Sequence, residues 1–363
     1  MGGADTDSRI RDGDAEFQLG RDLVAKAELE AAQIHLRRAA ALGHVDGTAL
    51  LGEQFFLTPP PIPSALVEEG IKFTLAAANA GHPAALHLAA VIAASYDAIP
   101  NHWQQALDFL ARAAAAGHKL APYELAFLAR DGAVMAQLAQ RAPIASDTWH
   151  RLAASIDIAA LTAAKPPRVV SKSPYIAMAE NVIPHDMCDW ITRRARPLLK
   201  PARIYNPPGA SNIVRRTNTD VTYPFPEYDM VLCVLRQRIA NATGYALDKM
   251  ELPAILHYVP GQEFSQHYDF LDPRVPAFAA EIEKFGQRMA TSLTYLSDDF
   301  DGGETDFTKV DIRLRGKKGD ALIFHNVEPS GAPDYQSLHA GRPTTRGEKW
   351  LVSQWIRGDK PPV

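Results

Sequence analysis

Two histidines and one aspartate in the last third of the chain have the residue types and the order to bind a metal ion. His267 and Asp269 are separated by one residue, and His339 follows far downstream. Two imidazoles and a hard carboxylate on one face of Fe(II) leave the opposite positions open for oxygen and a bidentate co-substrate. Because residues i and i+2 of a strand point to the same side, one strand can supply His267 and Asp269. His339 would then come from a neighbouring strand.

The surroundings of these residues read as strands joined by tight turns. A short apolar run, a Pro-Gly turn and a second strand-like run occupy residues 256–264, directly before His267. Lys349 follows His339 by ten residues, so it can lie on the next antiparallel strand and point into the same barrel. A lysine presents a compact positive charge, which can pair with the far carboxylate of a dicarboxylic co-substrate.

With these motifs, the sequence resembles the prolyl 4-hydroxylase family of Fe(II)- and 2-oxoglutarate-dependent dioxygenases. The resemblance covers about half of the chain, from about Pro174 to Arg357. Several ordered motifs at family spacing are far more specific than an isolated His-x-Asp. The motifs are Tyr258–Gln262, His267-x-Asp269, Gln287-Arg288, Tyr295-Leu296, Gly302–Thr305, Lys318–Leu322, Leu338–Gly341 and Gly347–Trp350.

The resemblance implies a role for each of these positions. The implied Fe(II) ligands are His267, Asp269 and His339. Lys349 would hold the distal carboxylate of 2-oxoglutarate, assisted by the hydroxyls of Tyr258 and Thr305. Arg288 and Trp355 match family positions near the peptide substrate or on the inner wall of the site. Structural alternatives stay open for three of them: barrel packing for Trp355, turn capping for Thr305 and a solvated charge for Arg288.

Three positions depart from the family pattern. Phe264 stands where a tyrosine is common, Arg357 replaces a histidine used near the substrate, and Thr344 replaces an apolar residue. These departures bear on the choice of substrate, not on the metal or the co-substrate. The carboxylate of Asp269 favours hydroxylation over halogenation, because halide-transferring relatives have a small residue at that position.

The implied fold of residues 173–363 is a double-stranded β-helix, or jelly roll, with supporting helices. The implied activity is hydroxylation of prolyl residues in a peptide or protein, coupled to decarboxylation of 2-oxoglutarate to succinate and CO2. Fe(II), 2-oxoglutarate and O2 would take part, with ascorbate as an accessory reductant. Alternatives are a hydroxylase of a free amino acid or small peptide, and a binding scaffold with an inactive or sensory oxygenase half. A zinc hydrolase is disfavoured because no glutamate has an obvious general-base spacing.

Residues 1–145 are rich in alanine and have an internal repeat. An alanine run followed by Gly-His recurs at residues 43–44, 81–82 and 117–118. Glycine is the usual residue after a helix C-terminus, so each pair marks a helix end. We expect His44, His82 and His118 to serve these turns rather than a metal. The pattern resembles Sel-like repeats of the tetratricopeptide type, stacked as an α-solenoid that binds protein, caps the fold or mediates dimerisation.

Residues 146–172 read as a connector that is extended around residues 165–168. Within the oxygenase half, we expect an entry strand and a first supporting helix over 182–191 and a second supporting helix over 228–243. Residues 203–218 are polar and rich in helix breakers, which favours a mobile lid. Residues 272–283 form a second variable insertion near the metal.

Composition sets outer bounds on these interpretations. The chain has 363 residues, of which 47% are hydrophobic, so about two domains are expected. The formal net charge is only −4, so we expect no nucleic-acid or membrane-surface partner. Cys188 and Cys233 are too few for a disulfide framework and fit a reducing compartment. The N-terminus lacks the basic and apolar regions of a signal peptide, so we expect a cytoplasmic protein.

Overall fold

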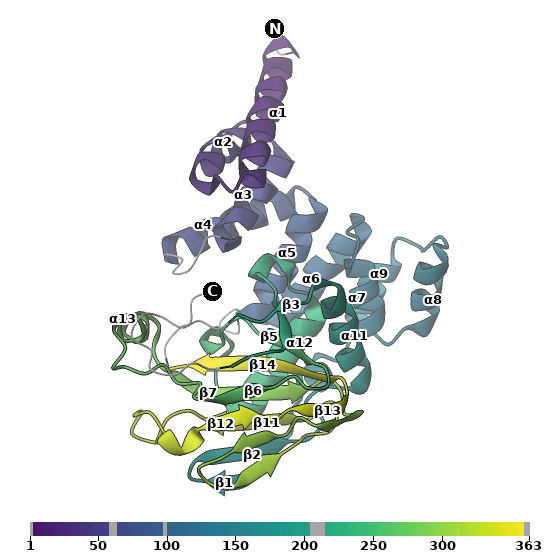
Figure 1. Ribbon diagram of the computed structural model, residues 1–363. Helices are drawn as coiled ribbons and strands as arrows, with labels where there is room; N and C mark the ends of the chain where they lie inside the picture. The colour runs from purple at the N-terminus through teal and green to yellow at the C-terminus, as the bar shows by residue number, and fades with distance from the viewer. Residues whose placement is uncertain (1–2, 58–63, 97–99, 204–214, 359–363) are drawn as a thin grey trace. The chain divides into compact units, whose positions relative to one another are not determined.

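The computed structural model describes residues 3–57, 64–96, 100–203 and 215–358. These residues cluster into two units. One unit comprises Met1–Leu161 together with Pro224–Cys233, and the other comprises Thr162–Tyr223 and Val234–Pro362. The first is helical and the second is built mainly from strands (Figure 1).

The helical unit is a series of helices in which chain neighbours pack on one another. Most helices contribute small buried alanines, which let their axes approach closely. The helices are α1 Gly3–Ala25, α2 Leu29–Ala41, α3 Val45–Leu57, α4 Ser64–Asn79, α5 Pro83–Ser95, α6 His102–Ala115, α7 Ala121–Leu128, α8 Gly132–Gln140, α9 Thr148–Ser155 and α10 Ile158–Thr162.

The Gly-His pairs end helices α2, α4 and α6 in the same way. Gly43, Gly81 and Gly117 all have a positive φ, between 85° and 87°. In each turn the glycine N–H donates three residues back and the histidine N–H donates five residues back. This is the Schellman arrangement, which satisfies two of the last carbonyls of the helix. The expected helix ends are therefore present at all three pairs.

The three histidines that follow these glycines each accept a backbone N–H from the first turn of the next helix. His44 Nδ1 accepts the N–H of Gly47 at 3.0 Å, His82 Nδ1 accepts that of Ala85 at 3.2 Å, and His118 Nδ1 accepts that of Ala121 at 3.2 Å. In all three turns the donor lies three residues after the histidine. Each bond satisfies a backbone donor that has no partner inside the helix. The prediction that these histidines serve the turns is therefore confirmed.

The strand unit forms two principal antiparallel sheets. The larger sheet has the strand order β1-β2-β11-β7-β14-β5-β4-β3, and the smaller sheet has the order β10-β9-β12-β6. Strands β13 and β8 form a separate pair. Two packed antiparallel sheets are consistent with the expected jelly roll. The strands are β1 Arg168–Lys172, β2 Tyr175–Ala179, β3 Lys200–Pro201, β4 Thr219–Thr222, β5 Ala254–Tyr258, β6 Phe264–His267, β7 Arg288–Tyr295, β8 Phe300–Gly302, β9 Thr305–Phe307, β10 Ile312–Leu314, β11 Ala321–His325, β12 His339–Gly341, β13 Thr344–Gly347 and β14 Lys349–Arg357.

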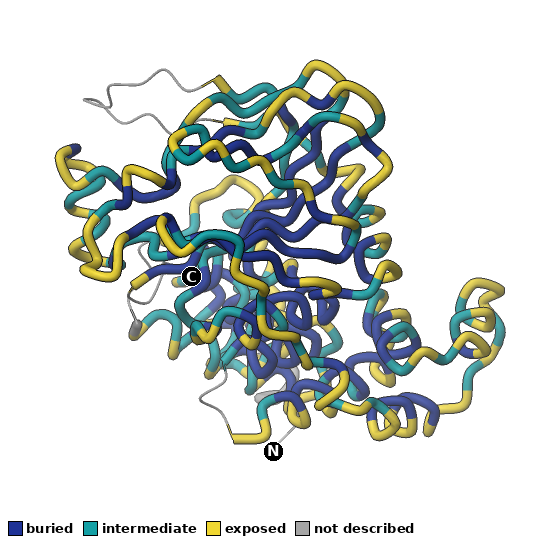
Figure 2. The backbone as a smooth tube through the Cα atoms, turned by 90° about the horizontal axis from the view of Figure 1, so that it is seen from below, coloured by how far each residue is buried: buried dark blue, intermediate teal, exposed yellow. Residues whose placement is uncertain are grey.

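The core of this unit lies on one face of the larger sheet. Almost every residue of its central strands is buried, and alternate residues share one core cluster, as the period of two requires: Leu256 and Tyr258 on β5, Leu293 and Tyr295 on β7, Leu322 and Phe324 on β11, and Leu351 on β14. Figure 2 shows these neighbouring strands as a block of buried backbone. Strand β7 is hydrogen-bonded to β11 on one side and to β14 on the other, so both of its edges are held.

Helices of this region are α11 His185–Ala195, α12 Met230–Thr243 and α13 Pro276–Phe285, with short 3-10 turns at Arg196–Leu198, Phe225–Glu227, Leu247–Lys249 and Tyr335–Ser337. The first supporting helix expected over 182–191 is present as α11, but the entry strand expected there is wrong, because the strand ends at Ala179 and residues 182–183 form a bend. The variable insertion over 272–283 holds α13. Of the expected lid, residues 204–214 lie outside the described residues.

Both cysteines are buried and unbonded to one another, Cys188 on α11 and Cys233 on α12. None of the helices in the described part of the chain is both long enough and apolar enough to cross a lipid bilayer.

Candidate active site

The two histidines and the aspartate expected to bind metal come together on the smaller sheet. His267 ends β6 and pairs directly with His339, the first residue of β12. Asp269 lies two residues beyond the end of β6, so a turn rather than strand alternation brings it to the site. Asp269 Oδ1 is 3.6 Å from His267 Nε2, and Oδ2 is 3.8 Å from His339 Nε2.

Both imidazoles present the same nitrogen to the shared centre. His267 Nδ1 lies 2.8 Å from the carbonyl oxygen of Ser265, and His339 Nδ1 lies 3.0 Å from that of Ser337. Each Nδ1–H therefore donates to backbone, which leaves the Nε2 lone pair as the ligand. The two ring planes are inclined at 58°, so the lone pairs can converge on one ion.

The protonation states also suit a metal site. Burial, together with the nearby His339, lowers the pKa of His267, so its imidazole is neutral at neutral pH. Burial opposes ionisation of Asp269, but the two imidazoles and a hydrogen bond from Thr291 outweigh it and hold the pKa of that carboxyl below its usual value. Two imidazoles and one carboxylate are the donor set that Fe(II) takes in this arrangement. The residues present fit the ion.

Lys349 lines the same pocket, at the start of β14 in the larger sheet. Its side chain is 1% exposed, and its Nζ donates to the carbonyl oxygen of Gly303 at 2.6 Å. Burial lowers the pKa of Lys349 to about 8. Among the described residues, it forms no ion pair. A buried ammonium group without a carboxylate partner is costly, so the site is prepared for an anion.

Tyr258 and Thr305 lie beside this lysine. Tyr258 is the direct cross-strand partner of Lys349, whose Nζ is 5.1 Å from the centre of the tyrosine ring. Thr305 begins β9 in the smaller sheet and is 2% exposed. Both residues line the pocket with the three candidate metal ligands. The pocket thus combines the candidate metal ligands with a cation and two hydroxyl-bearing side chains.

Comparison with known proteins decides the family. The model of the 2OG-Fe(II) oxygenase superfamily matches residues 253–357. Prolyl 4-hydroxylase 5 of Arabidopsis thaliana is 31% identical over 209 residues, which cover 52% of this chain and 70% of that protein. Probable prolyl 4-hydroxylase 3 of the same plant is 31% identical over 208 residues, covering 52% and 71%. The chain belongs to the prolyl 4-hydroxylase family.

Membership in the prolyl 4-hydroxylase family makes this protein a 2-oxoglutarate-dependent dioxygenase, with Fe(II), 2-oxoglutarate and O2 as cofactor and co-substrates. Among solved structures, the viral collagen prolyl hydroxylase of Paramecium Bursaria Chlorella virus-1 in its 2OG complex is 25% identical. The match covers 52% of this chain and 98% of that one, with a TM-score of 0.40.

Two further prolyl 4-hydroxylase family positions, Trp355 and Arg288, lie next to each other. Trp355 lines the pocket, and its buried Nε1 has no hydrogen-bond partner among the described residues. Arg288 is not part of the pocket lining; its guanidinium lies 3.9 Å from the centre of the Trp355 ring and forms two hydrogen bonds with Glu251, at 2.7 Å and 2.9 Å. Substrate contact by either residue stays a prediction.

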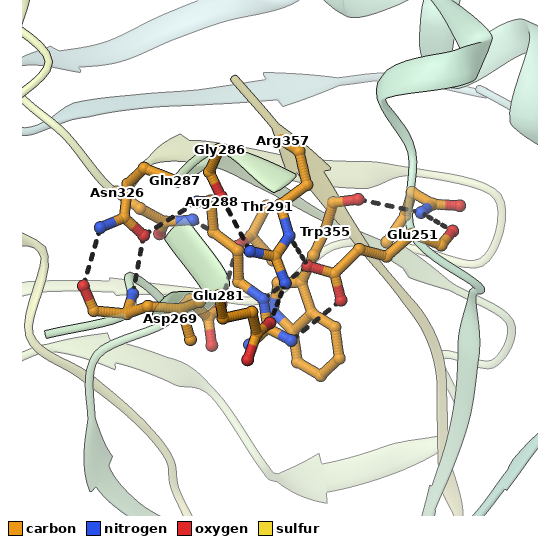
Figure 3. A network of polar contacts seen from close by, with 12 residues as sticks. Glu251, Asp269, Glu281, Gly286, Gln287, Arg288, Thr291, Asn326, Trp355 and Arg357 are labelled. Atoms are coloured by element: carbon orange, nitrogen blue, oxygen red, sulfur yellow. Dashed lines mark hydrogen bonds and ion pairs between the residues drawn. The ribbon is translucent and has the colours of Figure 1, made fainter. Parts of the chain in front are cut away.

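The departures from the family pattern have structural roles. Arg357 is 1% exposed and bonds Glu251, Glu281 of α13 and the carbonyl oxygen of Gly286, so its guanidinium is occupied by the protein (Figure 3). Phe264 stacks on the ring of His267, with 3.6 Å between the ring centres. Thr344 is buried at the first residue of β13.

Some residues that hold the site were missed by reasoning from sequence. Thr291 Oγ1 donates to Asp269 Oδ2 at 2.7 Å, and Asn326 Nδ2 donates to Thr291 Oγ1 at 3.0 Å. Gln287, noted only as part of a motif, bonds both the N–H and the carbonyl oxygen of Leu271 at 2.7 Å. The available signal was weak: Thr291 shares the inward phase of β7 with Leu293, where an apolar residue is the usual choice.

A second histidine cluster in the helical unit has a different geometry. His87, His118 and Glu124 offer ligand atoms within 4.8 Å of one another. However, both Glu124 oxygens are occupied, by His87 Nε2 at 2.8 Å and by Met230 N–H at 2.7 Å. The two imidazole rings are stacked, with 4.2 Å between their centres and 17° between their planes. This group is a buried polar network of the helical unit.

Proposed function

We propose that this enzyme hydroxylates prolyl residues within a peptide or protein, and couples this to conversion of 2-oxoglutarate to succinate and CO2. One observation carries the proposal: two imidazoles and a carboxylate that can share one ion line the same pocket as the buried cation of Lys349, which has no ion-pair partner among the described residues. The substrate class comes from the names of the relatives, which are prolyl 4-hydroxylases.

Each residue of the pocket has a defined task in this proposal. His267, Asp269 and His339 would hold Fe(II), which supplies the oxidative chemistry when bound. Lys349 binds the distal carboxylate of 2-oxoglutarate, and the hydroxyls of Tyr258 and Thr305 donate to the same group. Trp355 forms the wall on the substrate side and offers its free Nε1–H to a carbonyl oxygen of the peptide.

The test is turnover of proline-containing peptides by the full chain with Fe(II), 2-oxoglutarate and ascorbate. Mass spectrometry should find one added oxygen on proline, with one succinate released for each. His267→Ala and His339→Ala should abolish both products, whereas His150→Ala, at an exposed position of α9, should not. Oxygen added to free proline but not to any peptide would favour the small-molecule alternative. Partner capture without succinate release would favour a scaffold.

We also propose that the helical unit is a solenoid of Sel-like repeats that holds a macromolecular substrate. The identical turns at Gly43, Gly81 and Gly117 support repetition of one helical hairpin. The limits of the three segments, 1–145, 146–172 and 173–363, belong to this proposal. Two buried thiols support a reducing, cytoplasmic location, and ascorbate is proposed as the accessory reductant.

A further inference from the structure

We infer that Thr291, oriented by Asn326, is a positioning residue that sets the direction of the Asp269 carboxylate toward the metal. The inference rests on the proposed function only in taking His267, Asp269 and His339 as the metal ligands. It assigns a role to two residues outside that ligand set. Figure 3 draws Asp269, Thr291 and Asn326 together with the neighbouring arginine network.

The three side chains form a short hydrogen-bonded series. Asn326 Nδ2 donates to Thr291 Oγ1 at 3.0 Å, and Thr291 Oγ1 donates to Asp269 Oδ2 at 2.7 Å. Thr291 and Asn326 are both 0% exposed, and Asp269 is 6% exposed. Water therefore does not compete for these bonds, and a hydrogen bond to a carboxylate in such surroundings is strong.

The direction of the series follows from counting protons. An ionised carboxylate only accepts hydrogen bonds, so the one proton of the Thr291 hydroxyl goes to Asp269, and the hydroxyl oxygen accepts the amide N–H of Asn326. The hydroxyl proton is then committed to Asp269 Oδ2. The other carboxylate oxygen, Oδ1, lies 3.6 Å from His267 Nε2 and is the atom available to bind the metal. We expect the carboxylate to bind the ion through this oxygen alone, which keeps further coordination positions open for the co-substrates.

The series is attached to rigid parts of the fold. Thr291 is paired with Phe324 of β11 and with Trp355 of β14, in the middle of the larger sheet. The backbone of Asn326 is also fixed, because its N–H donates to Met289 and its carbonyl accepts from Asp334. Asp269 itself lies in a turn after β6 and lacks a strand to hold it. The larger sheet thus fixes the orientation of the Asp269 carboxylate, which the turn alone does not fix.

The same strand offers a matched control. Thr294 is also 0% exposed, three residues further along β7, but its hydroxyl has no hydrogen-bond partner among the described residues. Changing either threonine to valine keeps the shape and removes one hydroxyl. Any effect of burying an extra methyl group in β7 appears in both variants, whereas an effect on Asp269 appears only at residue 291.

The experiment measures binding of Co(II), a non-turnover probe of the Fe(II) site, by calorimetric and optical titration of the full chain. Thr291→Val should weaken binding by roughly 10- to 100-fold, the usual effect of losing a partner that orients a ligand. Thr291→Ser should bind within a few-fold of the unmodified protein, and Thr294→Val should be unchanged. Asn326→Ala should lie between Thr291→Ser and Thr291→Val. Melting in EDTA should show all variants folded before titration.

Unchanged Co(II) binding by Thr291→Val would overturn the inference, and so would a Thr291→Ser variant as weak as Thr291→Val. If Thr291→Val does not fold, the comparison of Thr291→Ser and Asn326→Ala decides, since only the second should lose affinity. The titration needs neither peptide nor turnover. An unmodified protein that binds Co(II) but hydroxylates no prolyl peptide would therefore disprove the substrate and leave the role of Thr291 testable.

Discussion

Lys349 is a buried cation that forms no ion pair with a carboxylate in the part of the chain that the structure describes. Burial lowers its pKa to about 8, and its one described hydrogen bond goes to the neutral carbonyl of Gly303. Keeping an unpaired ammonium group out of water costs several kcal/mol. A dicarboxylic acid that reaches it offsets this cost and gains a charge-assisted hydrogen bond.

We predict that Lys349→Ala raises the apparent KM for 2-oxoglutarate by roughly 10- to 100-fold, because a hydrogen bond to a charged group is worth about 1.5–3 kcal/mol. The measurement is succinate release at increasing 2-oxoglutarate with Fe(II) held in excess. Lys309→Ala, which removes an exposed lysine, is the matched control and should leave KM unchanged.

The pH dependence separates charge from packing. Lys349 is protonated below about pH 8 and loses its proton above it, so 2-oxoglutarate affinity should fall as the pH rises through 8. Lys349→Arg stays charged and should lose this dependence even if its larger head binds less well. A normal KM in Lys349→Ala, or an unchanged pH profile in Lys349→Arg, would remove the assignment.

At this scale, the sequence predicted residues whose chemistry demands a particular side chain. Few side chains other than histidine and a carboxylate can bind Fe(II) in this way, so His267, Asp269 and His339 stand out. Thr291 and Asn326 do not, because a threonine within an apolar strand looks like any packing residue. Only the register of β7 against β11 shows that its hydroxyl faces Asp269.

At the scale of elements, the carboxylate of Glu251 joins several parts of the strand unit. Glu251, before β5, pairs with Arg288 at the start of β7 and with Arg357 at the end of β14. Arg357 also pairs with Glu281 of α13. The two arginines are mostly buried and share Glu251, which keeps its pKa below the usual value despite its burial. Removing that one charge leaves two cations poorly paired.

We predict that Glu251→Gln destabilises the protein by about 3–5 kcal/mol, the usual cost of breaking a buried ion pair from one side. The measurement is urea unfolding followed by fluorescence. Asp301→Asn is the control, because its partner Arg346 is exposed and such surface pairs contribute little. Equal unfolding of the Glu251→Gln variant and the unmodified protein would show that the arginines find other partners.

Helix ends give a second prediction at this scale. Gly81 has a φ of +85°, with no atom within 4 Å of the position where a Cβ would be added. Gly81→Ala should therefore destabilise the helical unit by about 1 kcal/mol through backbone strain alone. Gly132, at the start of α8, also has open space around its Cβ position but an ordinary φ. Gly132→Ala should cause no loss, and thermal unfolding followed by circular dichroism compares the two.

The repeat was visible in sequence only where glycine marks it. The same turn also ends α1 at Ala27 and α7 at Arg130, with positive φ at both and the same backbone bonds. Asp131 then caps α8 as the histidines cap their helices. Because alanine and arginine can adopt this conformation at a cost of about 1–2 kcal/mol, the turn extends further along the chain than the Gly-His pattern predicts.

At the scale of the whole molecule, His82 and His118 predict that the helical unit is sensitive to acid. Burial lowers the pKa of His82, and burial next to His87 lowers the pKa of His118 to about 4. Each neutral ring accepts a backbone N–H at Nδ1, and protonation of that atom turns the acceptor into a donor. One cap contributes about 1 kcal/mol, so several together matter to a marginally stable unit.

The direction of the pH effect on stability follows from the lowered pKa values of His82 and His118. Unfolded histidine has a pKa of about 6.5, so between about pH 6.5 and 4 the unfolded chain binds more protons than the folded one. The stabilisation is complete above 6.5 and is lost as the pH falls. We predict that the melting temperature of the helical unit falls between about pH 7 and pH 5, as followed by circular dichroism at the helix band.

Asparagine keeps the cap and removes the titration, because its side-chain oxygen accepts the same N–H at every pH. The double variant with His82→Asn and His118→Asn should therefore melt like the unmodified protein near pH 7 and lose less stability on acidification. His150→Asn changes an exposed histidine of α9 and should keep the original slope. If the double variant and the unmodified protein lose stability equally with acid, carboxylates elsewhere control acid unfolding and the histidine caps only shape the turns.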